Sequence, residues 1–386
     1  MADNSTVFGL RHQARCLTAV KSNSDKSQFM AGSIGAKDNI VCLLAYDDDN
    51  NTIASTLYNH PDEVWDIASC PYDEQLFFTC HSSVASQNPL SRKATLWQRK
   101  ETTDTSNYNN NDQRQELNHL LQLEYEGVKK VLWCPQEQNH QIIAMGRTHL
   151  YLSSIESDTS ESILSIDASS LFTDETELPS LELLQNAVWN PHQPELIAVA
   201  DNTFAGWDLR SGSNTFTRRK AHESTMRAID YNPNKPYHMA TGGDDAFVKI
   251  WDTRQLKDPV MTLEGHTHWV WSVAFNSLQD QLLLTSSSDT VVNLHNVVSV
   301  SSAAYFEDYL SADDDETDEE GDSRALTKER MKPTDGLVCT YDQHEDSVYS
   351  VAWSAIDTWT FASISYAGRI VINQVPTQEK IKILGV

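Results

Sequence analysis

Two pairs of residues in the second half of the chain have the types and spacing of chemical sites. His266 and His268 form a His-x-His pair that could ligate a metal ion, and Asp244 and Asp245 are adjacent carboxylates suited to acid and base catalysis. No third ligand follows the histidines at a recognisable spacing. The sequence also lacks a glycine-rich phosphate loop, a GxSxG segment and an HExxH segment. We therefore expect a non-enzymatic protein with no catalytic residue, no metal, no cofactor and no small-molecule substrate.

A pattern that occurs twice within residues 222–296 contains these same side chains. In each copy a His precedes a Trp, or the residue that replaces it, by 29 residues, and an Asp lies six residues before that Trp position. The landmarks are His222, Asp245 and Trp251 in the first copy, and His266, Asp289 and His295 in the second. Apolar runs of strand length, separated by turn residues, lie between them. Each copy therefore predicts a unit of four short strands.

A repeat of this size, with His near its start and Trp-Asp at its end, resembles the WD40 repeat, whose members form the blades of β-propellers. The resemblance implies that a buried His donates to the Asp of a tight turn, that a Thr joins this relay, and that the Trp packs over it. The implied relay residues are His222, Thr241, Asp245 and Trp251 in one unit, and His266, Thr285 and Asp289 in the next. Such a relay satisfies its polar groups inside a blade, so we interpret these residues as structural.

The length of 386 residues fits seven such units once two polar insertions are set aside. We therefore predict an all-β protein, a single seven-bladed WD40 β-propeller over residues 1–386. A degenerate first repeat starts at His12, and the apolar segment 7–11 precedes it. We expect this N-terminal strand to pair with the last blade and close the ring, because closure removes an open sheet edge. The last repeat begins at His344 but has Ala367 at the Asp position and Asn373 at the Trp position, so its relay is incomplete.

Two insertions have compositions that disfavour a packed structure. Residues 99–118 are mostly Asn, Asp, Thr and Gln, and we predict a polar disordered loop. Residues 299–335 form an acidic insertion between the last two repeats, with ten acidic and no basic residues between Glu307 and Asp322. Such a block repels itself and stays solvated, so we expect disorder here too, and a spacer role is favoured over a binding role.

The charge and the cysteines limit the possible partners and compartments. A net charge of −26 disfavours nucleic acid and anionic membrane surfaces, which both require basic patches. The six cysteines form no CxxC pair, which indicates reduced thiols in the cytosol. The N-terminus lacks a signal-peptide pattern, and no apolar run approaches the length of a membrane span. We expect a cytoplasmic protein without direct membrane insertion.

Aligning the repeats on their His residues brings a set of large and charged side chains to equivalent positions near the start of the innermost strands. The set consists of Glu63, Trp65, Thr225, Arg227, Trp269, Trp271, Ser347 and Tyr349. Residues 269 and 271 alternate along a strand, so both Trp side chains should point the same way. Large aromatics beside an Arg are typical of a protein-binding hot spot. The alternative is that the rings pack between blades, as aromatics do in propellers.

Several segments together resemble a narrower family, the EARP and GARP complex-interacting proteins. They are Asn-Pro-Asn-Lys at 232–235, Gly-Asp-Asp at 243–245, Trp-Asp-Thr-Arg at 251–254, His-Trp-Val-Trp at 268–271, Asp-Gln-Leu-Leu-Leu-Thr at 280–285 and His-Glu-Asp-Ser-Val-Tyr at 344–349. The resemblance is strongest over residues 182–376. It implies a non-enzymatic adaptor that binds the EARP and GARP vesicle-tethering complexes and supports endosomal recycling and endosome-to-Golgi retrograde transport. It also implies peripheral association with endosomes and the trans-Golgi network.

Two other functions compete with this interpretation. Consecutive repeats end in Trp207-Asp-Leu-Arg and Trp251-Asp-Thr-Arg, which resemble the WDxR motif of substrate receptors for cullin-4 ubiquitin ligases. Arg after Trp-Asp is frequent in WD40 repeats and can serve the blade itself. A histone-binding propeller would benefit from an acidic surface, but the N-terminus lacks the expected supporting helix. Affinity purification would distinguish tethering subunits, the cullin adaptor and histones.

Overall fold

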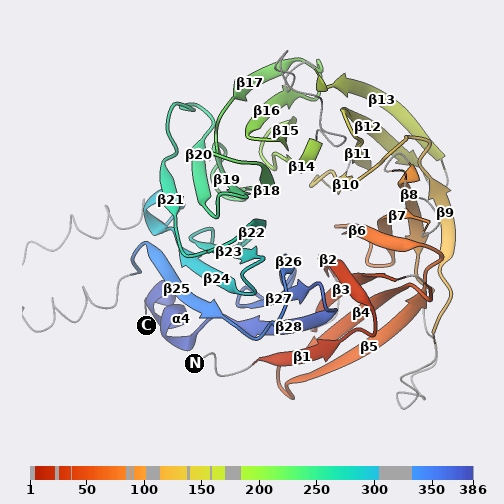
Figure 1. Ribbon diagram of the computed structural model, residues 1–386, viewed down its shortest axis with the longest axis horizontal. Helices are drawn as coiled ribbons and strands as arrows, with labels where there is room; N and C mark the ends of the chain where they lie inside the picture. Colours follow the sequence, from red (N-terminus) through yellow and green to blue (C-terminus); the bar gives the residue numbers. More distant parts are fainter. Residues whose placement is uncertain are drawn as a thin grey trace, which may run out of the picture.

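The computed structural model describes residues 5–21, 26–35, 37–83, 88, 91–100, 114–136, 140–156, 159–169, 184–303 and 333–385. Within them, the strands form seven four-stranded antiparallel sheets, which are arranged as blades around one axis (Figure 1). The prediction of an all-β, seven-bladed propeller is confirmed.

The first four blades each use four strands that are consecutive in the chain. Blade 1 contains β2 (Gln13–Val20), β3 (Ser27–Ile34), β4 (Ile40–Asp47) and β5 (Thr52–Asn59). Blade 2 contains β6 (Glu63–Ser69), β7 (Leu76–Ser82), β8 (Lys93–Gln98) and β9 (Asn118–Gln122). Blade 3 contains β10 (Lys130–Trp133), β11 (Gln141–Met145), β12 (His149–Glu156) and β13 (Thr159–Asp167). Blade 4 contains β14 (Leu184–Trp189), β15 (Glu195–Ala200), β16 (Thr203–Asp208) and β17 (Asn214–Arg218).

The last three blades complete the ring, and the final one includes a strand from the N-terminus. Blade 5 contains β18 (Met226–Tyr231), β19 (His238–Gly243), β20 (Val248–Asp252) and β21 (Met261–Leu263). Blade 6 contains β22 (Val270–Phe275), β23 (Leu282–Ser287), β24 (Val292–Asn296) and β25 (Gly336–Tyr341). Blade 7 contains β26 (Val348–Trp353), β27 (Thr360–Ser365), β28 (Arg369–Gln374) and β1 (Thr6–Gly9). A short 3-10 helix, η2 (Val298–Val300), lies between β24 and β25 of blade 6, and helix α4 (Thr377–Leu384) follows β28 of blade 7.

The ring is closed by the N-terminal strand, as the sequence predicts. β1 pairs antiparallel with β28, with Val7 opposite Val371 and Gly9 opposite Arg369. The strand is shorter than the predicted segment 7–11. Leu10 leaves the ladder to cross toward β2, and its backbone N–H donates to the Gly368 carbonyl. Closure leaves blade 7 with the same number of strands as its neighbours, and the outer edge of β28 is covered.

Apolar side chains fill the spaces between neighbouring blades. The Trp251 ring of blade 5 lies 5.3 Å from the Phe204 ring of blade 4, and both side chains are fully buried. Two glycines allow the closest approaches between blades. A Cβ on Gly242 would lie 2.6 Å from the side chain of Val270 in blade 6, and a Cβ on Gly32 would lie 2.4 Å from that of Val64 in blade 2. Such packing holds the innermost strands of adjacent blades at fixed positions.

The structure describes only the ends of the two predicted insertions, and these ends are hydrogen-bonded to the propeller. Residues 101–113 and 304–332 lie outside the described part of the chain. Within 99–118, Gln115 bridges Tyr58 of blade 1, because its backbone N–H and carbonyl exchange hydrogen bonds with β5. Within 299–335, Ser301 is completely buried, and the hydroxyl of Ser302 donates to the Asp280 carboxylate at 2.6 Å. Composition alone missed these ends because their order depends on hydrogen bonds to distant strands.

Candidate protein-binding face

The residues of the implied relay meet inside blade 5. Nδ1 of His222 lies 2.9 Å from the Asp245 carboxylate, and its Nε2 lies 2.8 Å from the Thr241 hydroxyl. The indole N–H of Trp251 donates to the same hydroxyl at 2.9 Å. His222 and Thr241 are buried, and these hydrogen bonds lower the pKa of Asp245 against the opposing effect of burial, which is the largest single influence. The four side chains therefore link two strands, β19 and β20, to the turn between them and to the segment that precedes β18.

Blade 6 repeats this arrangement with His295 in the Trp position. His266 contacts Asp289 at 2.9 Å through Nδ1 and Thr285 at 2.7 Å through Nε2, so both ring nitrogens are occupied. His295 Nε2 lies 3.3 Å from the Thr285 hydroxyl. Burial lowers the pKa of His295 to about 4, which keeps this ring neutral. In His268, Nδ1 accepts the backbone N–H of Trp269, so the His-x-His pair does not converge on a common point.

The innermost strands share a feature that sequence alternation does not reveal. In six of the seven blades the register between the first and second strand shifts by one residue near the start of the first strand. A β-bulge of this kind leaves one residue out of the ladder and redirects its side chain. We call the bulged residues the bulge ring; they are Arg15, Trp65, Gln185, Arg227, Trp271 and Tyr349. These strands lie nearest the centre of Figure 1.

One half of the bulge ring is centred on Arg227. Its guanidinium group lies 4.7 Å from the centroid of the Trp271 ring and 5.0 Å from that of Trp269. The same group donates two hydrogen bonds to the Asp244 carboxylate, at 2.5 and 2.7 Å. Trp271 in turn donates its indole N–H to the Ser288 hydroxyl at 2.6 Å. The aromatic rings are thus held by charge and hydrogen bonds as well as by packing, which fixes their orientation.

The other half of the bulge ring is centred on Arg15. The Arg15 guanidinium lies 4.4 Å from the centroid of the Tyr349 ring, 5.2 Å from that of Tyr366 and 5.5 Å from that of Trp65. The rings of Tyr349 and Trp271 are 4.6 Å apart, which joins the two halves. A continuous row of aromatic rings and guanidinium groups therefore crosses five consecutive blades, from blade 5 through blades 6, 7 and 1 to blade 2.

The structure distinguishes the predicted face residues from one another. Trp65, Arg227, Trp269, Trp271 and Tyr349 belong to the continuous row. The other three predicted residues, Glu63, Thr225 and Ser347, lie two positions before a bulge. There the backbone carbonyls of Thr225 and Ser347 accept N–H groups from the turn between the second and third strands. Burial raises the pKa of Glu63, which is close to Asp62.

Sequence reasoning missed three members of this row: Arg15, Tyr366 and Asp244 as the partner of Arg227. Arg15 was missed because the first repeat was aligned on His12. The bulge in β2 aligns Arg15 with Trp65, which is two residues earlier than the His12 spacing predicts. Asp244, the partner of Arg227, is visible in the sequence as the first of two adjacent carboxylates. The second, Asp245, belongs to the relay.

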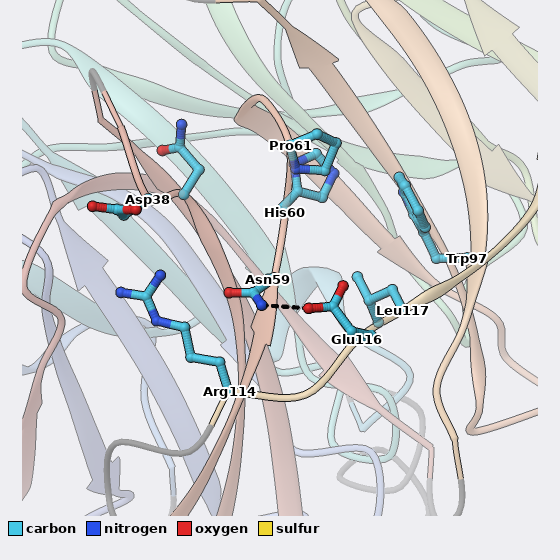
Figure 2. A pocket seen from close by; sticks show the side chains of 9 residues that line it. Asp38, Asn59, His60, Pro61, Trp97, Arg114, Glu116 and Leu117 are labelled. Atoms are coloured by element: carbon cyan, nitrogen blue, oxygen red, sulfur yellow. Dashed lines mark hydrogen bonds between the residues drawn. The ribbon is translucent and has the colours of Figure 1, made fainter.

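A pocket of about 350 Å³ lies where residues 114–117 cross from blade 2 to blade 1 (Figure 2). The Asn59 amide donates to the Glu116 carboxylate at 2.6 Å on one wall. His60 lies on another wall, but its Nε2 is already 3.1 Å from the Thr79 hydroxyl of blade 2. Burial lowers the pKa of His60 to about 4. The ring of His60 is therefore used within the blade, and the other ionisable residues that line the pocket are Asp38, Arg114 and Glu116.

The described residues contain neither a metal-binding cluster nor a membrane-spanning helix. No group of three or more His, Cys, Asp and Glu side chains there is arranged to hold a metal ion. No helix in this part of the chain has the length and apolar character needed to cross a membrane. All six cysteines are free thiols; five are buried and Cys339 is partly exposed. Burial raises the pKa of Cys42 to about 12, so this thiol stays protonated.

The seven blades, together with the His-Thr-Trp contacts of blades 2 and 5, define a WD-repeat β-propeller. The model of the EIPR1 β-propeller family matches residues 2–295, and the chain belongs to this family, in agreement with the predicted resemblance. The chain is 36% identical to EARP and GARP complex-interacting protein 1 of Homo sapiens over 99% of both chains. It is 37% identical to the EARP-interacting protein homolog of Danio rerio over 99% of both chains. It is also similar to WD repeat-containing protein DWA2 of Arabidopsis thaliana, with 31% identity over 95% of both chains.

Proposed function

We propose that this protein is a non-enzymatic adaptor that binds the EARP and GARP vesicle-tethering complexes and supports endosomal recycling and endosome-to-Golgi retrograde transport. The observation that carries the proposal is the similarity to relatives named for these complexes, which extends over 99% of both chains. The whole propeller is shared, so the similarity includes both ends of the ring and all blades. In this function the protein acts in the cytoplasm, at the surface of endosomes and the trans-Golgi network.

We place the partner-binding surface on the row of aromatic and guanidinium groups around the bulge ring. Binding hot spots are enriched in Trp, Tyr and Arg, and they gain affinity when their side chains are ordered before the partner arrives. Trp269 is 40% exposed, whereas its neighbours in the row are partly buried and fixed by hydrogen bonds. A partner therefore finds an accessible anchor on a rigid support. Packing between blades and binding are compatible roles for these rings, because all of them are at least partly exposed.

Affinity purification of the tagged full-length protein tests the proposed partner. We expect the subunits of the EARP and GARP complexes to co-purify, and we expect Trp269→Ala to reduce their recovery. Leu278→Ala is the matched control, because Leu278 is a 66% exposed apolar residue of the same blade just beyond the opposite end of β22. Recovery of neither complex with the wild-type protein would refute the proposed function.

The same purification tests the two competing functions. The cullin adaptor should co-purify if the WDxR endings bind a ubiquitin ligase. Histones should co-purify if the acidic surface is a histone-binding site. In the structure Arg254 donates two hydrogen bonds to Asp252 of its own blade, at 3.0 and 2.7 Å, and lies 4.5 Å from the centroid of the Tyr237 ring. These contacts favour a role of Arg254 within the blade.

A further inference from the structure

The turn of blade 7 has the same backbone geometry as the relay turns of blades 5 and 6. Gly368 has a φ of 79° and donates its N–H to the Ser365 carbonyl at 2.9 Å. Ala246 and Thr290, at the equivalent positions, have φ values of 66° and 74° and make the same hydrogen bond within their own turns. In each blade the preceding residue is the relay position, which is Asp in blades 5 and 6 and Ala367 in blade 7. The Cβ of Ala367 therefore lies where an Asp carboxylate would begin.

The absence of that carboxylate leaves a buried ring nitrogen of His344 without a partner. His344 is 4% exposed, and its Nε2 lies 2.8 Å from the Ser363 hydroxyl, but its Nδ1 has no hydrogen-bond partner among the described residues. In blade 5 the Asp245 carboxylate accepts from the equivalent Nδ1 and also from the backbone N–H of Glu223. The N–H of Glu345 occupies the position of Glu223, because each directly follows its relay His.

A pocket of about 330 Å³ opens at this same position. Its lining residues are Val7, Gly9, Glu345, Ser365, Ala367 and Arg369. Ala367 is exposed, so the space is accessible from solvent. The Arg369 guanidinium lies beside it and contacts the Glu345 carboxylate at 3.0 Å, while the Glu345 side chain is 81% exposed. The pocket thus places a cation, held by an exposed and displaceable acid, beside the Ala367 relay position, and the acid missing from that position is the one that would contact the buried His344 ring.

We propose that this pocket binds a carboxylate group, supplied by an Asp or Glu side chain of a partner protein, which completes the blade 7 relay from outside the chain. Nδ1–H of His344 and the N–H of Glu345 donate to the incoming carboxylate, and Arg369 contributes a favourable charge. Burial, with Arg369 as a smaller influence, lowers the pKa of His344 to about 4, so the ring is neutral and retains a single N–H. The Ser363 hydroxyl at Nε2 can donate or accept, so the incoming carboxylate itself selects the tautomer with the proton on Nδ1, as the Asp carboxylates do in blades 5 and 6.

The Glu345 carboxylate competes with an incoming carboxylate for Arg369, so substitution of this one residue should change the affinity of the pocket. An incoming carboxylate must share Arg369 with Glu345, whose exposed ion pair is weak. Glu345→Ala removes the competitor and should increase carboxylate affinity about threefold. Ala367→Asp supplies the missing acid within the chain and should prevent binding. The same substitution should raise the melting temperature by roughly 1–3 °C, because it satisfies the buried donor.

Histidine NMR on the full-length protein tests the proposal directly. The protein carries ¹³C at the imidazole Cε1 position, and His344→Gln assigns the His344 signal. The probes are two capped tripeptides, acetyl-Ala-Asp-Ala-amide and, as the matched control, acetyl-Ala-Asn-Ala-amide. We expect the Asp peptide to shift the His344 signal saturably, the Asn peptide to leave it in place, and Ala367→Asp to abolish the response.

Three results would overturn the proposal. They are equal shifts with both peptides, no saturable shift with the Asp peptide into the millimolar range, and an undiminished response in Ala367→Asp. Even if a variant fails to fold, comparing the two peptides on the wild-type protein shows whether the pocket prefers a carboxylate to an amide. Because the probes are peptides, the test does not depend on the proposed tethering partner, and the two proposals can fail separately.

Discussion

Replacing Thr241 by Val should destabilise blade 5 strongly even though the two side chains have nearly the same shape. Thr241 is 0% exposed, and its hydroxyl lies 2.8 Å from His222 Nε2 and 2.9 Å from the indole nitrogen of Trp251. Val removes the hydroxyl and leaves both buried ring groups without a partner. Each unsatisfied group costs about 1–2 kcal/mol, so we expect a loss of roughly 2–4 kcal/mol in the free energy of unfolding.

Differential scanning calorimetry measures this loss as a change in melting temperature. The unfolding entropy of globular proteins is about 2.1 cal/mol/K per residue, which gives about 0.8 kcal/mol/K for this chain if it unfolds in one transition. The expected loss then corresponds to a decrease of roughly 3–5 °C. Urea unfolding of the same variant provides an independent value for the free energy.

Blade 7 supplies a matched control for this prediction. Ser363 occupies the position of Thr241, but its hydroxyl contacts only one ring, that of His344 at 2.8 Å, because Asn373 replaces the Trp and both polar atoms of its amide lack partners. Ser363→Ala therefore leaves one ring unsatisfied and should cost about half as much, roughly 1–2 kcal/mol. If Thr241→Val were no more destabilising than Ser363→Ala, the shared hydroxyl would not be the element that stabilises the relay.

Three further predictions concern the ring, the acidic insertion and pH. Deleting residues 5–11 should lower the melting temperature by several degrees, because it exposes the edge of β28; an unchanged value would reject closure by β1. Deleting residues 305–330 should leave the melting temperature and circular dichroism unchanged, since the Ser299 N–H donates to Asp335 at 3.0 Å and already holds the flanks together; a cooperative loss of structure would contradict this. Burial lowers the pKa of His295 from the usual value of about 6.5 to about 4 in the folded protein. The stability that the neutral ring contributes is therefore lost as the pH falls from about 6.5 to about 4. In urea titrations at several pH values, His295→Gln should weaken this acid sensitivity; an identical pH profile would show that His295 does not cause it.

The fold was predictable because the relay is encoded by side chains at fixed spacing. The relay residues of blade 5 have the spacing of the repeat in the sequence and contact one another in the structure; they are His222, Thr241, Asp245 and Trp251. The alternation of apolar residues specifies the strands between them. Blades 3 and 4 lack the His, but their strands are still recognisable in the sequence. Ring closure was predictable for a different reason, since an apolar segment ahead of the first repeat has no blade of its own.

The binding face was only partly predictable because it depends on β-bulges. A bulge changes strand register without leaving a composition signal, so counting from the His located Trp271 and Tyr349 but missed Arg15. The contact between Arg15 and Tyr349 joins residues 334 positions apart, across the junction between blades 7 and 1. Local sequence contains no information about such a neighbour until the ring is closed.

The most direct test of the central claim is the affinity of purified EARP or GARP complex for the wild-type protein, Trp269→Ala and Leu278→Ala, measured by biolayer interferometry together with each melting temperature. If the row around the bulge ring is the partner-binding surface, Trp269→Ala should lose about 2 kcal/mol of binding free energy, roughly thirtyfold in Kd. Its melting temperature should change little, because the side chain is 40% exposed, and Leu278→Ala should bind as the wild type does. Normal affinity of a folded Trp269→Ala variant, or an equal loss in Leu278→Ala, would contradict the account.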